Sequence, residues 1–520
     1  MGGRRLAALA GVVAVAAALA VGELLAGLVD GVPSLVTSVG AVLVPFVPPA
    51  LESWAIQTFG TSDKAVLNAG TVVLTLAVGA VAGVRGPRGG ARIIGVLGAV
   101  GLMAALASPL RAPAATLLAI GAVVAVGVLT LRRLLRRLPA TPATEASDAP
   151  AAGGDERAEQ ANDASRRSFL TAAVGALAAA GVVAVAGRAL TRRRAGDIAA
   201  AARDLPQPSR ALPPVQPAQA FSDVEGLTPI LVPNDRFYRI DTALSVPRID
   251  VDTWSLRITG MVEEEVELTY DDLLGMRLVE RDVTLSCVSN EVGGDLVGNA
   301  RWLGVPLVDV LELAGVQDGA SQLVGRSVDG WTAGFPTEVA FDGRESLVAV
   351  GMNGEPLPRQ HGYPARLVVP GLYGYVSATK WLTEIELTTL EAFDAYWVPR
   401  GWSKLGPVKM SSRIDVPRSG ASVPAGATRF AGVAWDPAVG VQAVELRIDD
   451  GEWVPCETTE PLADTAWVQW KVDVDLAAGD HIAEVRMTNA AGDLQVQEYA
   501  PPRPDGATGW HSVRVRVRDA

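Results

Sequence analysis

The residue in this chain best suited to chemistry is a cysteine. Cys287 lies in the run VTLSCVSNEVGG at positions 283–294, and the chain has one other cysteine, Cys456. A thiolate is a soft ligand suited to a metal held by sulfur. A lone cysteine can also be a nucleophile, a redox sensor or, most often, a small buried apolar residue, which we expect for Cys456. Two cysteines argue against a disulfide-dependent fold.

Three side chains further along the chain could hold an anion. His361, Arg366 and Lys380 lie within the run HGYPARLVVPGLYGYVSATKW at positions 361–381. Arginine offers a planar fork of donors and lysine a point charge, which together suit a phosphate or pyrophosphate. Taken singly, each is more often a surface or structural residue. His361 could instead be the base of a cysteine protease, but its place beside Arg366 and a glycine-rich turn favours anion binding.

The order and spacing of these segments resemble the sulfite oxidase family of molybdenum enzymes. In that family one cysteine thiolate binds molybdenum, and His-Gly-x-Pro-x-Arg and Lys-Trp elements hold the pterin cofactor. Other family-like segments are 233–239 (PNDRFYR), Asn290 in a Cys-x-x-Asn pattern, 299–304 (NARWLG), 328–331 (VDGW) and 352–358 (MNGEPLP). The resemblance covers about residues 230–520.

The resemblance implies a molybdenum–molybdopterin cofactor and oxygen-atom transfer, with Cys287 as metal ligand rather than nucleophile. The residues expected to be catalytic are Cys287, Arg239 and Trp402, of which Arg239 would favour an anionic or polar substrate oxygen and Trp402 would wall the substrate funnel. The residues expected to bind the cofactor are Asn234, Tyr238, Arg239, Cys287, Asn290, Asp329, His361, Arg366, Thr379 and Lys380.

Several positions depart from the family pattern, and they leave the substrate open. Glu291 and Val292 stand where sulfite oxidases carry two arginines, and Ile240 and Asp241 stand where they carry Asn-His. The family's active-site tyrosine would fall near Trp402. The chain shows no haem domain, and its three histidines all lie beyond position 360. We therefore expect no haem in this chain.

The first 190 residues are dominated by Ala, Val, Leu and Gly and predict a membrane region. About twenty apolar residues can cross a bilayer. Five stretches qualify: 6–29, 65–84, 93–109, 114–131 and 169–185. The stretch 35–47 is apolar but short and bracketed by prolines, and we expect it to be a re-entrant or interfacial piece.

Arginines predict the orientation of these spans. They cluster at positions 4–5, 85–92 and 132–137. The positive-inside rule places all three clusters in the cytoplasm if 35–47 does not cross, and the last span then delivers the remainder of the chain outside. That span opens with Arg166 and Arg167, which resemble a twin-arginine export signal. Two ordinary arginines flanking a helix are the alternative.

The predicted fold class is therefore multi-domain. An N-terminal α-helical transmembrane region precedes an α+β sulfite-oxidase-like molybdopterin domain and a C-terminal all-β immunoglobulin-like sandwich. The expected segments are 1–137 (four spans and the piece at 35–47), 138–164 (cytoplasmic linker), 165–190 (final anchor), 191–228 (Pro/Ala-rich linker), 229–400 (molybdopterin domain) and 401–520 (sandwich).

The expected function is oxygen-atom transfer on a small S- or N-oxo compound at the outer side of a cell membrane. Partners would be that substrate, a separate cytochrome or quinone-linked electron carrier, membrane lipid and a second copy bound through the C-terminal domain. The net charge of −12 argues against nucleic acid. One alternative is a cofactor-free extracytoplasmic binding or sensor module on a membrane anchor. A transporter or scaffold ranks last, because the spans carry little charge besides Glu23.

Overall fold

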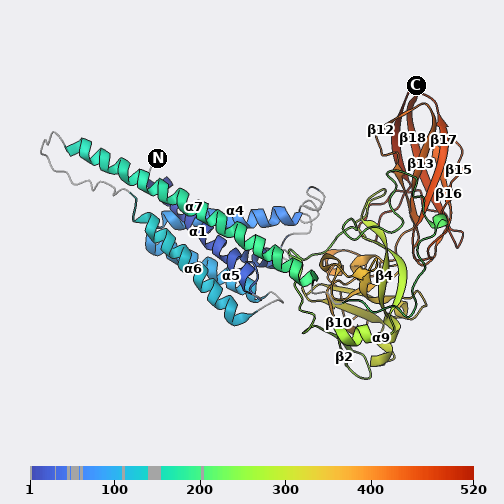
Figure 1. The fold of residues 1–520 in the computed structure, drawn as a ribbon, viewed down its shortest axis with the longest axis horizontal. Helices are drawn as coiled ribbons and strands as arrows, with labels where there is room; N and C mark the ends of the chain where they lie inside the picture. Colours follow the sequence, from blue (N-terminus) through green and yellow to red (C-terminus); the bar gives the residue numbers. More distant parts are fainter. Residues whose placement is uncertain are drawn as a thin grey trace. The chain divides into compact units, whose positions relative to one another are not determined.

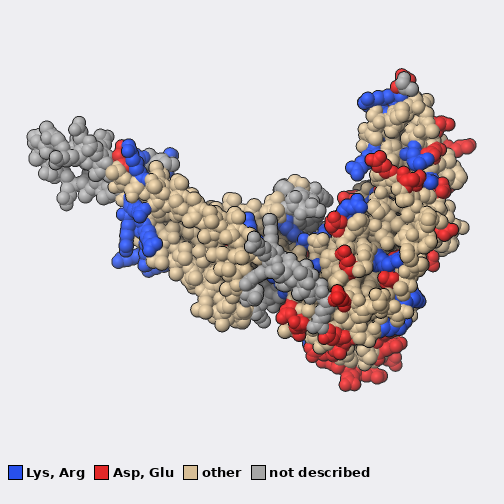
Figure 2. Space-filling view, viewed as in Figure 1, with Lys and Arg blue, Asp and Glu red and all other residues tan. Residues whose placement is uncertain are grey.

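The computed structural model describes residues 3–29, 31–43, 63–107, 112–138, 154–200 and 204–519, with 47 and 58 as single residues. It consists of two compact units, Met1–Ala201 with Ala243–Arg248, and Ala202–Thr242 with Ile249–Ala520 (Figure 1). On the face drawn in Figure 2, the helical unit shows a wide uncharged surface, whereas charged side chains of both signs are scattered over the second unit.

Five long apolar helices build the first unit, at the places where the sequence predicts spans. They are α1 (Gly3–Leu28), α4 (Asp63–Val84), α5 (Gly86–Leu106), α6 (Pro113–Leu135) and α7 (Gly154–Ala200). Each contains a stretch long and apolar enough to cross a membrane. Prolines in the first turns of α5 and α6 suit their starts, because a helix needs no backbone donor there.

Helix α1 lies at the centre of this unit and packs on α4, α6 and α7. Glycines permit the close approach: a methyl group on Gly11 would overlap the backbone of α4, and one on Gly27 would lie 2.6 Å from the Gly187 carbonyl oxygen of α7. Small residues serve the same purpose between membrane helices generally.

The lengths of α2 and α7 bear on two of the predicted membrane segments. Helix α2 (Leu35–Leu43) has nine residues, and at about 1.5 Å per residue it is too short to span a bilayer. The remainder of 35–47 lies outside the described residues, except for position 47. Helix α7 extends beyond the expected anchor 165–190 at both ends, because the flanking segments are rich in the helix formers Ala, Glu and Arg.

Two sheets form the predicted molybdopterin domain in the second unit. One has the order β2-β1-β10-β5-β6, and the other has the order β3-β4-β7-β8 with β9 paired to β7. The strands are β1 (Ser255–Gly260), β2 (Val266–Thr269), β3 (Val279–Ser286), β4 (Val297–Pro306), β5 (Gln322–Ser327), β6 (Thr332–Pro336), β7 (Leu347–Met352), β8 (Glu355–Pro356), β9 (Arg366–Val368) and β10 (Leu382–Thr388).

Short helices connect these strands. They are α8 (Tyr270–Gly275), α9 (Leu307–Ala314) and α10 (Gly374–Ser377). Helix α8 begins at a capping box, in which the Thr269 hydroxyl accepts from the Asp272 backbone N–H at 3.2 Å.

The C-terminal part is a two-sheet β-sandwich. The sheets have the orders β11-β13-β17-β16 and β12-β19-β18-β14-β15. The strands are β11 (Ser411–Val416), β12 (Ala421–Pro424), β13 (Gly426–Trp435), β14 (Val441–Ile448), β15 (Val454–Pro455), β16 (Glu457–Thr458), β17 (Val468–Leu476), β18 (Gly479–Asn489) and β19 (His511–Arg518). Phe430 and Trp470 from one sheet meet Leu446 and Val485 from the other in a shared core, against which Cys456 packs half-buried.

Candidate functional site

Cys287 directly follows β3 and begins the loop that leads to β4. Its side chain is buried, and its Sγ accepts from the Ser289 backbone N–H at 3.4 Å. Burial raises the pKa of the thiol, because a thiolate in a low-dielectric site loses its hydration. The thiol is therefore protonated at neutral pH until a positive centre such as a metal ion binds it.

The Cys287 loop, defined here as residues 287–296, is closed by its own hydrogen bonds. The Cys287 N–H donates to the Leu296 carbonyl at 2.9 Å, and the Leu296 N–H donates to the Asn290 Oδ1 at 2.8 Å. The Asn290 N–H donates in turn to the Cys287 carbonyl at 3.0 Å. Asn290 thus fixes the shape of the loop that presents the cysteine.

The predicted anion cradle forms around His361, Arg366 and Lys380. Arg366 Nη1 donates to the His361 carbonyl at 3.1 Å, and its guanidinium lies 5.0 Å from the centre of the Trp302 ring. Gly362, with φ of 117°, separates these segments, and a Cβ there would lie 3.0 Å from Arg366 Cβ and 3.2 Å from Lys380 Cα. The glycine of the His-Gly motif is therefore required for the close approach.

Burial shifts the pKa of each cradle side chain downward, because it penalises the charged forms. The pKa falls to about 4 for His361, to about 10 for Arg366 and to about 8 for Lys380. His361 is neutral at pH 7, and its Nε2 lies 2.8 Å from the Asn234 carbonyl oxygen. Since a carbonyl only accepts, Nε2 carries the proton and Nδ1 is left as an acceptor.

Asp241 is a cradle residue that the sequence did not single out for a role. Its carboxylate accepts from Lys380 Nζ at 2.7 Å and from Arg239 Nε at 2.9 Å. Arg239 was expected at the substrate, and the structure places it in this ion pair, beside Lys380. The signal in the sequence is the departure at Asp241 itself, where the family pattern has no carboxylate.

Asn234 and Tyr238 lie in the segment that crosses the cradle. The Asn234 side chain holds this segment in place, because its Nδ2 donates to the Met352 carbonyl at 3.2 Å. The contact to His361 is made by the backbone carbonyl of Asn234. Tyr238 is near both Cys287 and Arg366. Desolvation raises the pKa of its phenol above the usual value, the Cys287 thiolate raises it further and the Arg366 guanidinium opposes the shift.

Three other predicted residues have local partners. The Thr379 hydroxyl lies 3.4 Å from the Gly325 carbonyl, and Asp329 Oδ1 accepts from the Trp331 N–H at 3.2 Å. The Trp402 ring lies 5.9 Å from that of Tyr375. In the described part of the chain, no hydrogen bond, ion pair or ring contact joins these three side chains to Cys287, and their predicted roles stay predictions.

Tyr373 lies near the Cys287 thiol, which the sequence did not predict. It is buried, and burial raises the pKa of its phenol to about 12, with the Cys287 thiolate contributing to the shift. Its oxygen accepts from the Lys409 N–H at 3.2 Å, so the hydroxyl proton stays available for donation. The signal available in the sequence was the Gly-Leu-Tyr-Gly-Tyr turn at 371–375.

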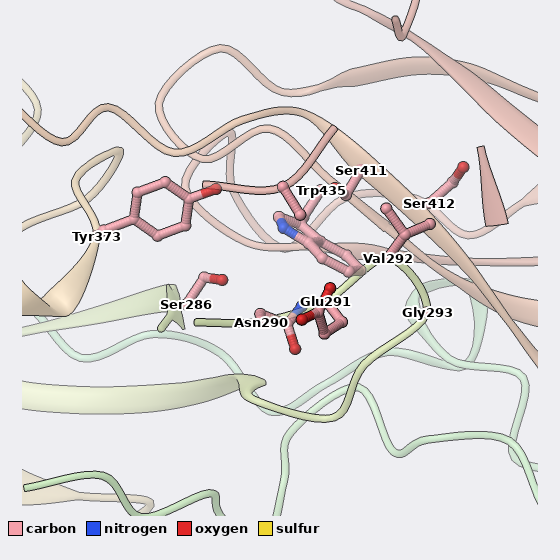
Figure 3. A pocket seen from close by; sticks show the side chains of 10 residues that line it. Ser286, Asn290, Glu291, Val292, Gly293, Tyr373, Ser411, Ser412 and Trp435 are labelled. Atoms are coloured by element: carbon pink, nitrogen blue, oxygen red, sulfur yellow. The ribbon is translucent and has the colours of Figure 1, made fainter. Parts of the chain in front are cut away.

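A pocket opens next to this loop, between it and the sandwich (Figure 3). It is lined by Ser286, Asn290, Glu291, Val292, Gly293, Tyr373, Ser411, Ser412, Trp435 and Ala507. The close-up shows Tyr373 and Trp435 on one side and the loop with Asn290 and Glu291 on the other. The sandwich thus contributes directly to the surroundings of the Cys287 loop.

The sandwich also holds the loop in place. Arg413 of β11 donates to the Gly294 carbonyl at 2.7 Å and forms an ion pair with Asp415 at 2.6 Å, with both side chains 8% exposed. The same guanidinium donates to the Thr228 hydroxyl at 2.9 Å. A methyl group on Gly293 would overlap the ring of His511. The Arg413 clamp, meaning Arg413 with these partners, joins three distant segments of the chain.

These residues fit the cofactor that the resemblance implies. Arg366 donates to two backbone carbonyls, and within the described residues it forms no ion pair with a carboxylate. The cradle therefore holds more buried positive charge than Asp241 balances, as a bound anion requires. In the described part of the chain no three His, Cys, Asp or Glu side chains gather as a metal site. A metal at Cys287 would need most of its ligands from a cofactor.

Comparisons with known proteins agree. A family model described as "Oxidoreductase molybdopterin binding domain" matches residues 243–397. The uncharacterized oxidoreductase YuiH of Bacillus subtilis (strain 168) is 34% identical over 165 residues, which cover 32% of this chain and 80% of the relative. Human mitochondrial sulfite oxidase is 29% identical over 339 residues, which cover 55% of this chain and 62% of the relative's length.

One solved structure aligns with 55% of this chain. It is the sulfane dehydrogenase SoxCD from Paracoccus pantotrophus, with a TM-score of 0.49, 22% identity and 81% of that chain covered. Two matches assign the family: the match to YuiH, which covers most of that relative's length, and the match of the molybdopterin-domain model. This chain belongs to the sulfite oxidase family of molybdopterin-dependent oxidoreductases.

Proposed function

We propose that this protein is a membrane-anchored molybdenum-cofactor oxidoreductase that carries out oxygen-atom transfer on a small S- or N-oxo compound outside the cytoplasm. The observation that carries the proposal is that the second unit buries both a thiol and a group of cations whose positive charge is not fully balanced by carboxylates. The cations do not serve stability, since burying an unmatched charge costs free energy. Both are explained by a cofactor that brings a metal to Cys287 and an anionic group to the cradle.

The bound cofactor would supply two-electron oxygen-atom transfer, and the protein would supply binding and orientation. Cys287 would provide the sulfur ligand. Arg366 and Lys380 would hold the anionic end, and His361, fixed as the Nε2–H form, would offer Nδ1 as an acceptor. Tyr373, protonated at neutral pH, would donate a hydrogen bond toward the space beside the thiol.

The helical unit supports a location at a membrane. Its arginine clusters lie at the start of α1, at the start of α5 and at the end of α6, which favours a cytoplasmic side for these ends. Arg166 and Arg167 in α7 would then serve as the export signal that moves the folded domain outward. The histidines lie outside this unit, so electrons would pass to or from a separate cytochrome or quinone-linked protein.

The sandwich is proposed to be an immunoglobulin-like dimerisation domain. Its two sheets and shared core support the architecture, and the family resemblance suggests the second copy. This part of the proposal is independent of the cofactor chemistry.

The test is the metal and pterin content of the purified full chain from a host that makes molybdopterin. Near-stoichiometric molybdenum is expected in the parent. Cys287→Ser should lose the metal or alter its Mo(V) signal, because a hydroxyl is a poor substitute for a thiolate ligand. Cys456→Ser is the matched control and should keep parental content. Folded parent protein without metal or pterin would refute the proposal and leave the cofactor-free binding module.

A further inference from the structure

We infer that an apolar strip on the surface of the sandwich is the docking surface for a small one-electron carrier protein with a basic rim around its redox centre. The strip consists of Trp453, Val454, Leu494, Val496, Tyr499 and Trp510. The inference rests on the proposed function, because it names the surface at which the molybdenum enzyme would meet its electron partner.

The segment 494–499, which follows β18, presents most of the strip. Gln495 is buried. Since side chains alternate in an extended chain, its neighbours Leu494 and Val496 face outward. Val496 is 53% exposed and Tyr499 is 64% exposed. A continuous set of exposed apolar side chains with polar surroundings is typical of a protein interaction site.

Two half-buried tryptophans extend the strip. The Trp510 ring lies 5.0 Å from that of Trp453, and its Nε1 donates to the Gln495 carbonyl at 3.0 Å. The guanidinium groups of Arg447 and Arg486 lie 4.8 Å and 4.1 Å from the centre of the Trp453 ring. Each cation also has a carboxylate partner, so it holds the rings in place without adding net charge. Tryptophan and tyrosine are among the residues that dominate the binding energy of protein interfaces.

The strip adjoins the Cys287 loop. The Tyr499 hydroxyl donates to the Glu291 carboxylate at 3.4 Å. A Cβ on Gly509 would lie 3.3 Å from Tyr499 Cα and 3.6 Å from Val292 Cγ2, and Figure 3 shows Glu291 and Val292 on the loop beside the sandwich. Glu291 follows Cys287 by four residues, so their Cα atoms are at most about 14 Å apart. A carrier seated at the Tyr499 end of the strip would therefore lie close enough to a metal at Cys287 for electron tunnelling.

Unpaired carboxylates surround the strip. Four exposed acidic residues adjoin it and form no ion pair within the described part of the chain: Glu291, Glu452, Asp493 and Glu498. Three of them directly precede a strip residue, and Glu291 contacts Tyr499. An apolar centre with a rim of one charge sign favours a partner with the opposite sign, which it attracts from solution. The matching surface is therefore basic around an apolar centre.

The same charges argue against a second copy of this chain at the strip. A twofold interface places the same surface on both subunits. The carboxylates of one copy would then face those of the other, and like charges in contact repel. The dimer of the proposed function would therefore use a different face of the sandwich.

Electron exchange at this surface balances with oxygen-atom transfer. Oxidation of a substrate takes an oxygen atom from water and releases two protons and two electrons. Two oxidised carriers, docking one after the other, each accept one electron. Reduction of an oxide runs the same steps in reverse with two reduced carriers. The carrier must leave after each electron, which a small apolar contact with a charged rim allows.

The first test measures binding of oxidised cytochrome c, a small basic haem protein, to the full chain without molybdenum. The chain is held in nanodiscs of zwitterionic phosphatidylcholine, so that the lipid does not attract the probe. Binding to the parent should weaken as salt rises. The double variant Glu452→Gln, Glu498→Gln should bind about tenfold more weakly at low salt and depend less on salt, because two attracting charges are gone.

A second double variant tests the apolar contact. Val496→Ser, Tyr499→Ser should weaken binding about tenfold and keep the salt dependence of the parent, because it removes apolar area and no charge. Two matched controls change the same chemistry elsewhere in the second unit. Asp475→Asn removes an exposed carboxylate from β17, and Leu313→Ser removes an exposed apolar side chain from α9. Both controls should bind like the parent.

Three results would overturn the inference. One is a parent that shows no salt-dependent binding, and another is a pair of strip variants that bind as tightly as the controls. The third is a parent dimer that dissociates when Val496 and Tyr499 are replaced by serine, because the strip would then join two copies of this chain.

Molybdenum-loaded protein provides an independent measurement. Dithionite-reduced parent is mixed with oxidised cytochrome c, and both double variants should slow reduction of the cytochrome about tenfold. Reduction of ferricyanide, a small ion that needs no docking surface, should be no slower than in the parent. Equal slowing of both acceptors would place the defect at the metal and contradict a docking role. Protein without molybdenum would contradict the proposed function instead, and the binding test would still decide the role of the strip.

Discussion

At the scale of single residues, the cradle depends on how burial treats charge. Lys380 is held by Asp241 at 2.7 Å and lies 4.7 Å from the centre of the Trp381 ring, yet desolvation still lowers its pKa to about 8. A bound anion would favour the ammonium form and raise that pKa again. Anion binding should therefore depend on pH in the range where most lysines remain charged.

We predict that cofactor-free full chain binds sulfate more weakly as the pH rises through about 8. The reason is that Lys380 loses its proton and its charge, so affinity should fall by up to about tenfold per pH unit. Below pH 7 the affinity should be constant, and near pH 8 binding should take up protons. Calorimetry in buffers of different ionisation enthalpy measures both effects.

Lys380→Met should remove the pH step and weaken binding about tenfold at pH 7, the loss typical of one charge-assisted hydrogen bond. Lys404→Met is the matched control, because Lys404 pairs with Asp394 at 2.7 Å in a more exposed setting. A pH step that survives in Lys380→Met would assign the titration to another group.

At the scale of elements, the Cys287 loop is held jointly by its own hydrogen bonds and by the sandwich. Strands β3 and β4 fix the two ends of the loop, since they pair from Val279–Gly304 to Ser286–Val297. Strand β11 holds its middle through the Arg413 clamp. The C-terminal domain is therefore part of the site and not merely an appendage.

We predict that Arg413→Ala frees the loop. It removes the donor to Gly294 and leaves Asp415 buried without its cation, which costs about 3 kcal/mol of unfolding free energy. Hydrogen exchange of residues 288–296 should accelerate in full-length protein in detergent. Arg429→Ala is the matched control: its ion pair with Asp473 is exposed on the same sheet, so its effect should be much smaller. Equal exchange in both variants would show that the clamp does not hold the loop.

At the scale of the whole molecule, the chain combines a helical unit with a largely apolar surface and a second unit with many charged side chains on its surface. The helical unit leaves large apolar side chains such as Leu118 and Val182 exposed, at 77% and 71%. Such exposure is stable in hydrocarbon and costly in water. The second unit instead buries its large side chains in sheet cores and exposes charge.

We predict that the sandwich and the start of α5 lie on opposite sides of the membrane. A membrane-impermeant maleimide should label Glu452→Cys, on the sandwich, in intact cells or spheroplasts. It should label Arg88→Cys, in the first turn of α5, only after permeabilisation, because basic ends of membrane spans stay in the cytoplasm. Parent protein, with Cys287 buried and Cys456 half-buried, gives the background. Labelling of Arg88→Cys in intact cells would contradict this orientation.

The sequence by itself determined the parts of this protein that are local in the chain. Apolar stretches of about twenty residues predicted the five long helices, because a helix of that length is what a bilayer-spanning segment forms. The motif around Cys287 and the run from His361 to Lys380 indicated the cofactor class, since their spacing reflects one binding site.

Only the tertiary structure decided which distant segments meet. It paired Lys380 with Asp241, brought Tyr373 near Cys287, placed Trp402 against Tyr375 and placed Glu291 between the loop and the sandwich. Such contacts depend on loop paths and on packing between segments far apart in the sequence, as Arg413 and Gly294 illustrate. No local pattern encodes them, because hydrophobic packing fixes their geometry collectively.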